Sequence, residues 1–242
     1  TYIWDGKVTL STKKIQAENE KGRFELSNFN CEYRLDFEKG EKALSVKAGI
    51  GADKIIGGPN QIKDDFVEIG INNIDADSFE EFMELYSQIM VSISDEMSEE
   101  SGKDPKNVNK DMKKRFTALG LQMAGAYEKL LKQGLELQIS GLKATLPQGR
   151  IQGNISLGLK KDMTMVQFIP LAVQPTLALD IFSLKSDFIL PVELICENPK
   201  LLQPVFPGMM TGLFVKEGDD MIHQAETRKG KLFLNGQELR LP

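Results

Sequence analysis

The sequence predicts an α+β protein, with one large antiparallel, meander-type sheet and two amphipathic helices packed on it. Three observations support this fold class. Polar and apolar residues alternate through most of residues 1–75 and again through 134–160, the apolar period changes to 3.6 between 76 and 133, and short turn signals separate successive strands. Strands joined by tight turns pair antiparallel, and helices inserted between two sets of strands pack on the sheet.

The clearest hairpin runs from Gly134 to Lys160. Apolar residues occupy the odd positions from 135 to 139 and the even positions from 142 to 146, and the odd positions again from 151 to 159. The first change of phase predicts a β-bulge near Ser140–Gly141, where glycine relieves the steric cost of an extra residue. Pro147 and Gly149 suit a three-residue loop between two long strands.

The N-terminal third is also strand-like. Residues Phe29 to Phe37 carry the strongest alternation, with an apolar, largely aromatic face and a charged face, and Ala43–Ala48 and Phe66–Ile74 predict further strands. The glycine-rich stretch Gly49–Asn60 follows a strand, as phosphate-binding loops do. It lacks the third glycine and the following helix that such a loop needs, so a loop or a bulged edge strand is favoured.

Two helices are expected within residues 76–133. Phe79 to Met97 carry an apolar stripe with a period of 3.6, and Asp77 or Ser78 is the expected N-terminal cap. A second stripe extends from Val108 to Leu130, and Gly134 is the expected helix end. Between the stripes lies a polar connection.

Residues Met163 to Phe214 form the most apolar part of the chain, and six prolines interrupt it. Leu177–Leu190 is expected to be extended, and Pro191 suits the first turn of a short helix that ends near Glu197. Beyond Phe214, short strands separated by glycine turns are expected as far as Asn235–Gly236.

Five apolar residues beside turn formers are the candidate binding residues. They either cover the core or form an exposed lip that contacts an apolar ligand or a partner, because contiguous exposed apolar surface usually marks an interaction site. The residues of this lip are Phe206, Met209, Met210, Leu213 and Phe214.

Composition narrows the classes of function. The 242 residues suit a single α+β domain spanning 1–242, and the formal net charge of −5 argues against a nucleic-acid partner. No apolar run reaches the roughly 20 residues that a transmembrane helix requires. The chain starts within a strand-like run, so we expect it to be a fragment of a longer protein. Homo-oligomerisation stays open.

No residue pattern predicts a catalytic, cofactor or metal site. His223 is the only histidine and is expected to be an ordinary strand residue. Cys31 and Cys196 are expected to be buried free thiols, with a disulfide between them as the alternative. An enzyme would need carboxylates, such as Asp219 and Asp220, that only the fold brings together.

Two passages resemble a known family. They are LKATLPQG from Leu142 to Gly149, followed by an alternating strand, and GMMTGLFVKEGDDMIHQAETRKGKLFLNG from Gly208 to Gly236. Both look like the C-terminal half of the YdgA-like family, and the resemblance extends from about Asp77 to Gly236. It implies a β-rich protein of the bacterial cell envelope, in the periplasm, with an inner-membrane anchor outside this chain. The family has no established catalytic residues.

Two functions from different classes follow. The favoured one is a non-enzymatic binding or scaffolding module that presents an apolar surface to a lipid-like ligand or a partner protein of the envelope. The alternative is a hydrolase-type enzyme that uses carboxylates assembled by the fold. An open apolar groove would favour the first, and a polar pocket with paired carboxylates the second.

Overall fold

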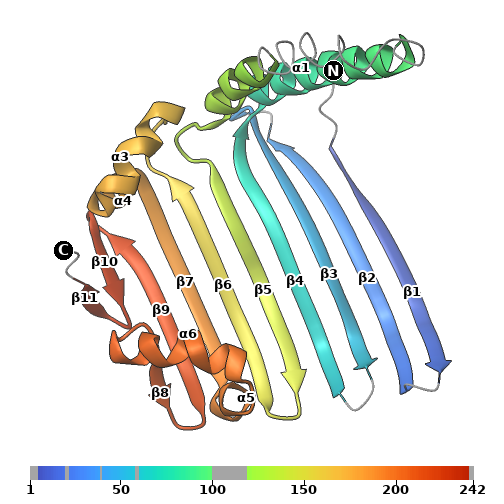
Figure 1. The fold of residues 1–242 in the computed structure, drawn as a ribbon, viewed down its shortest axis with the longest axis vertical. Coiled ribbons are helices and arrows are strands. Elements are labelled where there is room, and N and C mark those ends of the chain that lie inside the picture. The colour runs from blue at the N-terminus through green and yellow to red at the C-terminus, as the bar shows by residue number, and fades with distance from the viewer. Residues whose placement is uncertain (1–4, 20–21, 39, 58–59, 100–118, 240–242) are drawn as a thin grey trace, which may run out of the picture.

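A computed structural model describes residues 5–19, 22–38, 40–57, 60–99 and 119–239. Its centre is a single antiparallel sheet of 11 strands in the order β1-β2-β3-β4-β5-β6-β7-β9-β10-β11, with β8 pairing beside β9 (Figure 1). Neighbours in the chain are therefore mostly neighbours in the sheet, and helices pack on it. The predicted α+β class and its meander-type sheet are confirmed.

The strands differ strongly in length. The first four have 14 to 17 residues each, whereas β8 and β11 have three. Their bounds are β1 Gly6–Asn19, β2 Gly22–Glu38, β3 Ala43–Gly57, β4 Asn60–Asp75, β5 Glu136–Leu146, β6 Gly149–Leu159, β7 Phe182–Pro191, β8 Val215–Glu217, β9 Asp220–Arg228, β10 Lys231–Leu234 and β11 Gln237–Leu239.

The helices gather near the two ends of the strands. Helix α1 and the helical residues 119–130 lie across one end of the sheet, while α5 and α6 lie across β7 and β9 near the other end (Figure 1). The bounds are α1 Ala76–Glu99, α3 Phe168–Val173, α4 Ala178–Ile181, α5 Val192–Glu197 and α6 Pro199–Met210, with single 3-10 turns at Met165–Gln167 and Pro175–Leu177.

Four local expectations are wrong. Residues 49–57 belong to the interior strand β3, which is paired on both sides, and do not form a loop or an edge strand. The cap of α1 is Asp75, whose Oδ1 accepts a hydrogen bond from the Ser78 amide at 2.8 Å, as an N-cap does. The second helix ends at residue 130 rather than at Gly134, and residues 177–181 are helical before β7 begins.

The predicted central hairpin is confirmed. Strands β5 and β6 pair antiparallel, and their register shifts between Ile139 and Leu142, where Gly141 has a φ of +61°. The expected bulge is therefore present, and glycine accommodates its positive φ. The loop is one residue shorter than expected, because Leu146 and Gly149 already face each other.

Three clusters of buried side chains make up the core. One joins Leu35, Leu44 and Ile74 to Phe79 of α1, a second surrounds Leu159 and Met163, and the third joins Met221 to the helices α5 and α6. Each cluster lies where a helix or turn meets the sheet. Between them the sheet has no comparable buried cluster among the residues described.

Candidate functional site

One face of the sheet is apolar. Direct cross-strand partners share a face, so the strand register identifies its residues. One row pairs, from β2 to β7, Leu35, Val46, Ile71, Leu137, Leu157 and Leu184, and the next pairs, from β1 to β6, Val8, Tyr33, Ala48, Ile69, Ile139 and Ile155. A third row pairs Leu10, Cys31, Ile50 and Val67.

The rows between them are polar and belong to the opposite face. One pairs Lys7, Arg34, Lys47, Gly70, Gln138 and Ser156, and another pairs Thr9, Glu32, Gly49, Glu68 and Ser140. Successive side chains of a strand point to opposite faces. The sheet is therefore amphipathic across its first six strands.

The alternation of polar and apolar residues changes phase partway along the strands. As a result, the apolar residues near the hairpin tips stay on the same face as those of the three rows. Asn28, Asp64 and Gly141 have positive φ at this level of the sheet, and the register of β4 with β5 shifts on both sides of Phe66. On the hairpin-tip side of this shift, Lys63 pairs with Thr145, and Thr145 pairs with Arg150. Arg150 alternates with the apolar positions of β6, so all three belong to the polar face.

The change of phase also places a further apolar row on the apolar face. The row that contains Lys63 continues through its direct partners Lys54, Ser27 and Lys14. Each of these four residues has an apolar neighbour in sequence, and these neighbours are themselves direct partners: Ile15, Leu26, Ile55 and Ile62. They consequently lie on the apolar face. Without the change of phase these four side chains would share the charged face.

Helices cover this apolar face only in part. Leu44 is 0% exposed beneath α1, whereas Leu10 is 66%, Ile69 57% and Leu137 49% exposed. We call the exposed residues of the three rows the apolar strip: Val8, Leu10, Tyr33, Ile50, Ile69, Ile71, Leu137, Ile139 and Leu157. The strip runs across β1–β6, and an exposed apolar area of this breadth usually marks a binding surface.

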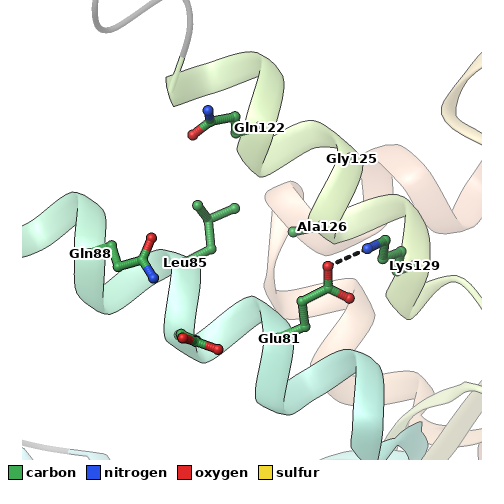
Figure 2. Close-up of a pocket in the computed structure, with 8 residues that line it drawn as sticks. Glu81, Leu85, Gln88, Gln122, Gly125, Ala126 and Lys129 are labelled. Carbon is green, nitrogen blue, oxygen red and sulfur yellow. Dashed lines mark hydrogen bonds and ion pairs between the residues drawn. The ribbon is translucent and has the colours of Figure 1, made fainter.

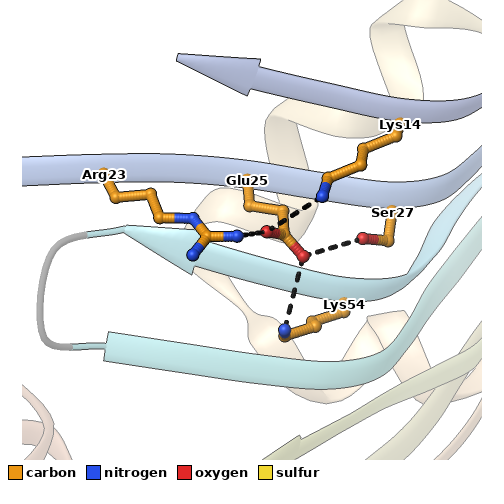
Figure 3. Close-up of polar contacts among 5 residues, drawn as sticks. All are labelled: Lys14, Arg23, Glu25, Ser27 and Lys54. Carbon is orange, nitrogen blue, oxygen red and sulfur yellow. Dashed lines mark hydrogen bonds and ion pairs between the residues drawn. The ribbon is translucent and has the colours of Figure 1, made fainter. Parts of the chain in front are cut away.

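On the polar face, Glu25 lies among three cations (Figure 3). Its carboxylate pairs with the Arg23 guanidinium, with Lys54 Nζ at 3.3 Å and with Lys14 Nζ at 3.6 Å, and it accepts a hydrogen bond from Ser27 Oγ at 3.3 Å. Burial raises the pKa of Glu25, but hydrogen bonds from Arg23 and Lys54 and the positive charges of Arg23 and Lys14 outweigh it. The net pKa is about 2.

Glu25 is expected to make folding stability depend on acid pH. Its folded pKa of about 2 lies below the ordinary 4.5, so the ionised carboxylate stabilises the fold above pH 4.5 and this contribution disappears as the pH falls toward 2. Urea unfolding of wild type and Glu25→Gln across that range checks it. The stability gap should narrow on acidification, and a gap that stays constant contradicts the assignment. Glu238→Gln, at an exposed ion pair, is the control.

A hollow lies between α1 and the 119–130 helix (Figure 2). It measures about 460 Å³ and is lined by Glu81, Glu84, Leu85, Gln88, Gln122, Gly125, Ala126 and Lys129. An ion pair between Lys129 and Glu81 joins the two helices at its side. Three charged and two amide side chains line this hollow, which makes it less suited to a purely apolar ligand than the apolar strip.

The five residues of the lip differ in their exposure to solvent. Phe206, Met209 and Met210 are exposed on α6, whereas Leu213 and Phe214 follow the helix and are half-buried. Phe214 packs against the core cluster of Met221 and lies 5.5 Å from the His223 ring, centroid to centroid. The role of the lip in binding stays a prediction.

His223 is a buried residue of β9. Its Nε2 lies 2.8 Å from Ser186 Oγ and its Nδ1 2.9 Å from the Leu213 carbonyl oxygen, while the rings of Phe188 and Phe214 flank it. A backbone carbonyl rather than a carboxylate thus orients the imidazole. These contacts tie the segment after α6 to the sheet and leave the side chain 8% exposed.

The other candidate residues are two aspartates and two cysteines. Asp219 contributes its carbonyl to the Val192 amide, and Asp220 begins β9 opposite Pro191. Cys31 and Cys196 are both free thiols, as expected, but Cys196 is exposed on α5 and Cys31 is half-buried, so their expected burial is wrong. Within the described ranges no three His, Cys, Asp or Glu side chains are grouped to hold a metal.

In the part of the chain that the structure covers, no helix is both long enough and apolar enough to cross a bilayer.

The sequence reasoning missed the apolar strip. The alternation of the strands was predicted, but their apolar residues were expected to be buried beneath the helices. The signal that could have found the strip is the imbalance between many long amphipathic strands and only two long helical patterns.

Comparison with known proteins gives one match. A family model described as "Bacterial protein of unknown function (DUF945)" matches residues 1–242. No curated protein and no solved structure matches the chain.

Proposed function

The chain belongs to DUF945, a bacterial family of unknown function, and we propose that it is a non-enzymatic binding module whose apolar strip holds an acyl chain of a lipid-like ligand. The observation that carries this proposal is the strip itself. Nine exposed apolar side chains from six strands form one surface, and their direct cross-strand partners within the three rows are also apolar.

The chemistry of the strip suits a hydrocarbon. Eight of its nine residues are Val, Leu or Ile, and Tyr33 is the ninth. Seven of the nine lie on the interior strands β2–β6, whose backbone groups are paired within the sheet on both sides, so a ligand can gain mainly apolar contacts there. Protein partners are usually anchored by Trp, Tyr and Arg in pockets, and such anchors are sparse here.

The dimensions also suit an acyl chain. Neighbouring strands lie about 4.8 Å apart, so a path from β1 to β6 is about 24 Å long. The hydrocarbon core of a bilayer is about 30 Å thick, so one leaflet of chains spans about 15 Å. An acyl chain of that span therefore fits within the strip, and each methylene that it buries contributes about 0.8 kcal/mol.

The cell envelope is the proposed setting. The YdgA-like resemblance supports a periplasmic position, where a protein that handles lipid-like molecules would meet them, and the bacterial family match is consistent with it. The contacts of His223 with Ser186 and a backbone carbonyl support a structural role for the histidine, and thereby the non-enzymatic part of the proposal.

The proposal is tested by removing the apolar character of the strip. We expect the triple variant Leu10→Ser, Ile69→Ser, Leu137→Ser to bind a long-chain fatty acid at least about tenfold more weakly than wild type, because three apolar contacts are lost. Native mass spectrometry after gentle purification measures any retained lipid, and titration with palmitate measures affinity.

A matched control separates this effect from general loss of apolar surface. Leu121, Val166 and Val173 are at least as exposed as the three strip residues, and none belongs to the strip or to the lip. Changing all three to serine should leave palmitate binding unchanged. Equal binding by wild type and the strip variant contradicts the proposal, and so does a wild-type protein that retains no lipid and binds no added palmitate.

A further inference from the structure

A row of cations crosses the polar face close to the hairpin tips. From β1 to β6 the direct partners are Lys14, Ser27, Lys54, Lys63, Thr145 and Arg150. The row contains four cations, two hydroxyl groups and no acid. Such an alignment attracts anions, and Ser and Thr hydroxyls can donate hydrogen bonds to them.

The charges of this row are balanced on one side only. Glu25 neutralises part of the charge of Lys14 and Lys54. Lys63 and Arg150 have no ion pair within the ranges that the structure covers, and the chain neighbours Asp64 and Asp65 form none with Lys63. Lys54 and Lys63 face each other directly, an arrangement of like charges that is destabilising unless an anion joins them.

A hollow lies at the unbalanced side. It has a volume of about 180 Å³ and is lined by Gln61, Lys63, Thr145, Leu146 and Pro147. Lys63 and Thr145 belong to the polar face. Leu146 comes from the apolar series of β5 and adjoins Pro147 at the hairpin tip. The hollow is therefore bordered by residues of both faces at the end of the sheet.

We propose that this hollow binds the phosphate group of a lipid whose acyl chain passes over Leu146 to the apolar face and runs along that face toward the apolar strip, with Lys63 as its principal cationic contact. The inference rests on the proposed function and names the polar end of the ligand. Lys63 provides charge, Thr145 and Gln61 provide hydrogen-bond donors, and Leu146 leads from the hollow to the apolar face.

The test compares two lipids with the same acyl chain. A lysophosphatidic acid carries a phosphate monoester, whereas the corresponding monoacylglycerol is uncharged. Isothermal titration should show that wild type binds the phosphate lipid about tenfold more tightly, and that Lys63→Gln reduces this preference to about twofold or less. Lys47→Gln, which removes a lysine from another row of the same face, should leave the preference unchanged.

The outcomes separate the two proposals. Equal binding of both lipids by wild type, or a preference that survives in Lys63→Gln, overturns the phosphate site while the acyl-chain proposal stands. Binding of neither lipid overturns both. Inorganic phosphate is the third ligand, and if it binds as tightly as the phosphate lipid and loses affinity in Lys63→Gln, the site takes free phosphate and the lipid assignment is overturned.

Discussion

Replacing Leu44 with alanine is expected to lower the free energy of unfolding by about 2–5 kcal/mol, the usual cost of truncating a fully buried leucine. Leu44 is 0% exposed and packs with Leu35 and Ile74 where α1 covers the sheet. The truncation leaves a cavity that a rigid sheet closes poorly. Urea unfolding followed by circular dichroism measures the loss.

The matched control lies on the same apolar face. Leu10 carries the same side chain on β1 but is 66% exposed, so Leu10→Ala should change stability by no more than about 0.5 kcal/mol. The contrast tests whether helices bury one end of this face and leave the strip open. Similar losses for Leu44→Ala and Leu10→Ala would show that the strip is as buried as the core.

Gly153→Ala is expected to destabilise the protein by about 1–3 kcal/mol through overpacking. A Cβ at this position of β6 would lie 2.2 Å from Phe188 Cδ1 and 2.6 Å from its Cε1. The ring on β7 therefore covers the glycine backbone directly. Thermal and urea unfolding of the variant give the size of the effect.

A second substitution checks the cause. Phe188→Leu shortens the side chain, so the double variant Gly153→Ala, Phe188→Leu should be less destabilised than the sum of the two single variants. Gly125→Ala is the control, because a Cβ there meets nothing within 4 Å and alanine favours a helix by about 0.8–1 kcal/mol. Strict additivity of the two changes would exclude the contact between residues 153 and 188.

Much of the fold could be predicted because each long strand carries its own signal. The alternation from residue 29 to 37 and from 151 to 159 identifies strands by a local rule, since side chains of a strand alternate between faces. The bulge at Gly141 was visible as a slip in the same pattern. Tight turns then gave the antiparallel order of neighbours.

The part of the apolar face that the helices bury could not be predicted in the same way. Strands of about 15 residues are about 50 Å long, whereas α1 is about 36 Å long and about 10 Å wide. A helix that lies across the strand ends therefore leaves most of their length uncovered. Periodicity shows that a strand has an apolar face, but the position of the helix decides whether that face is buried.

The candidate site depends on long-range register. Lys14, Lys54, Lys63 and Arg150 are far apart in sequence and form a row only because the changes of phase near Asn28 and Asp64 are matched between strands. No local pattern carries that information. The lip, by contrast, was inferred from local composition, and the structure divides its residues between an exposed helix face and the core.

The most direct test of the acyl-chain site is photolabelling with a long-chain fatty acid that carries a diazirine in its chain, followed by mass spectrometry of the labelled peptides. The account predicts labels on strip residues such as Tyr33, Ile50 and Ile69, with palmitate competing for them. Labels confined to Phe206, Met209 and Met210 of α6, or spread over the polar face without competition, would contradict it.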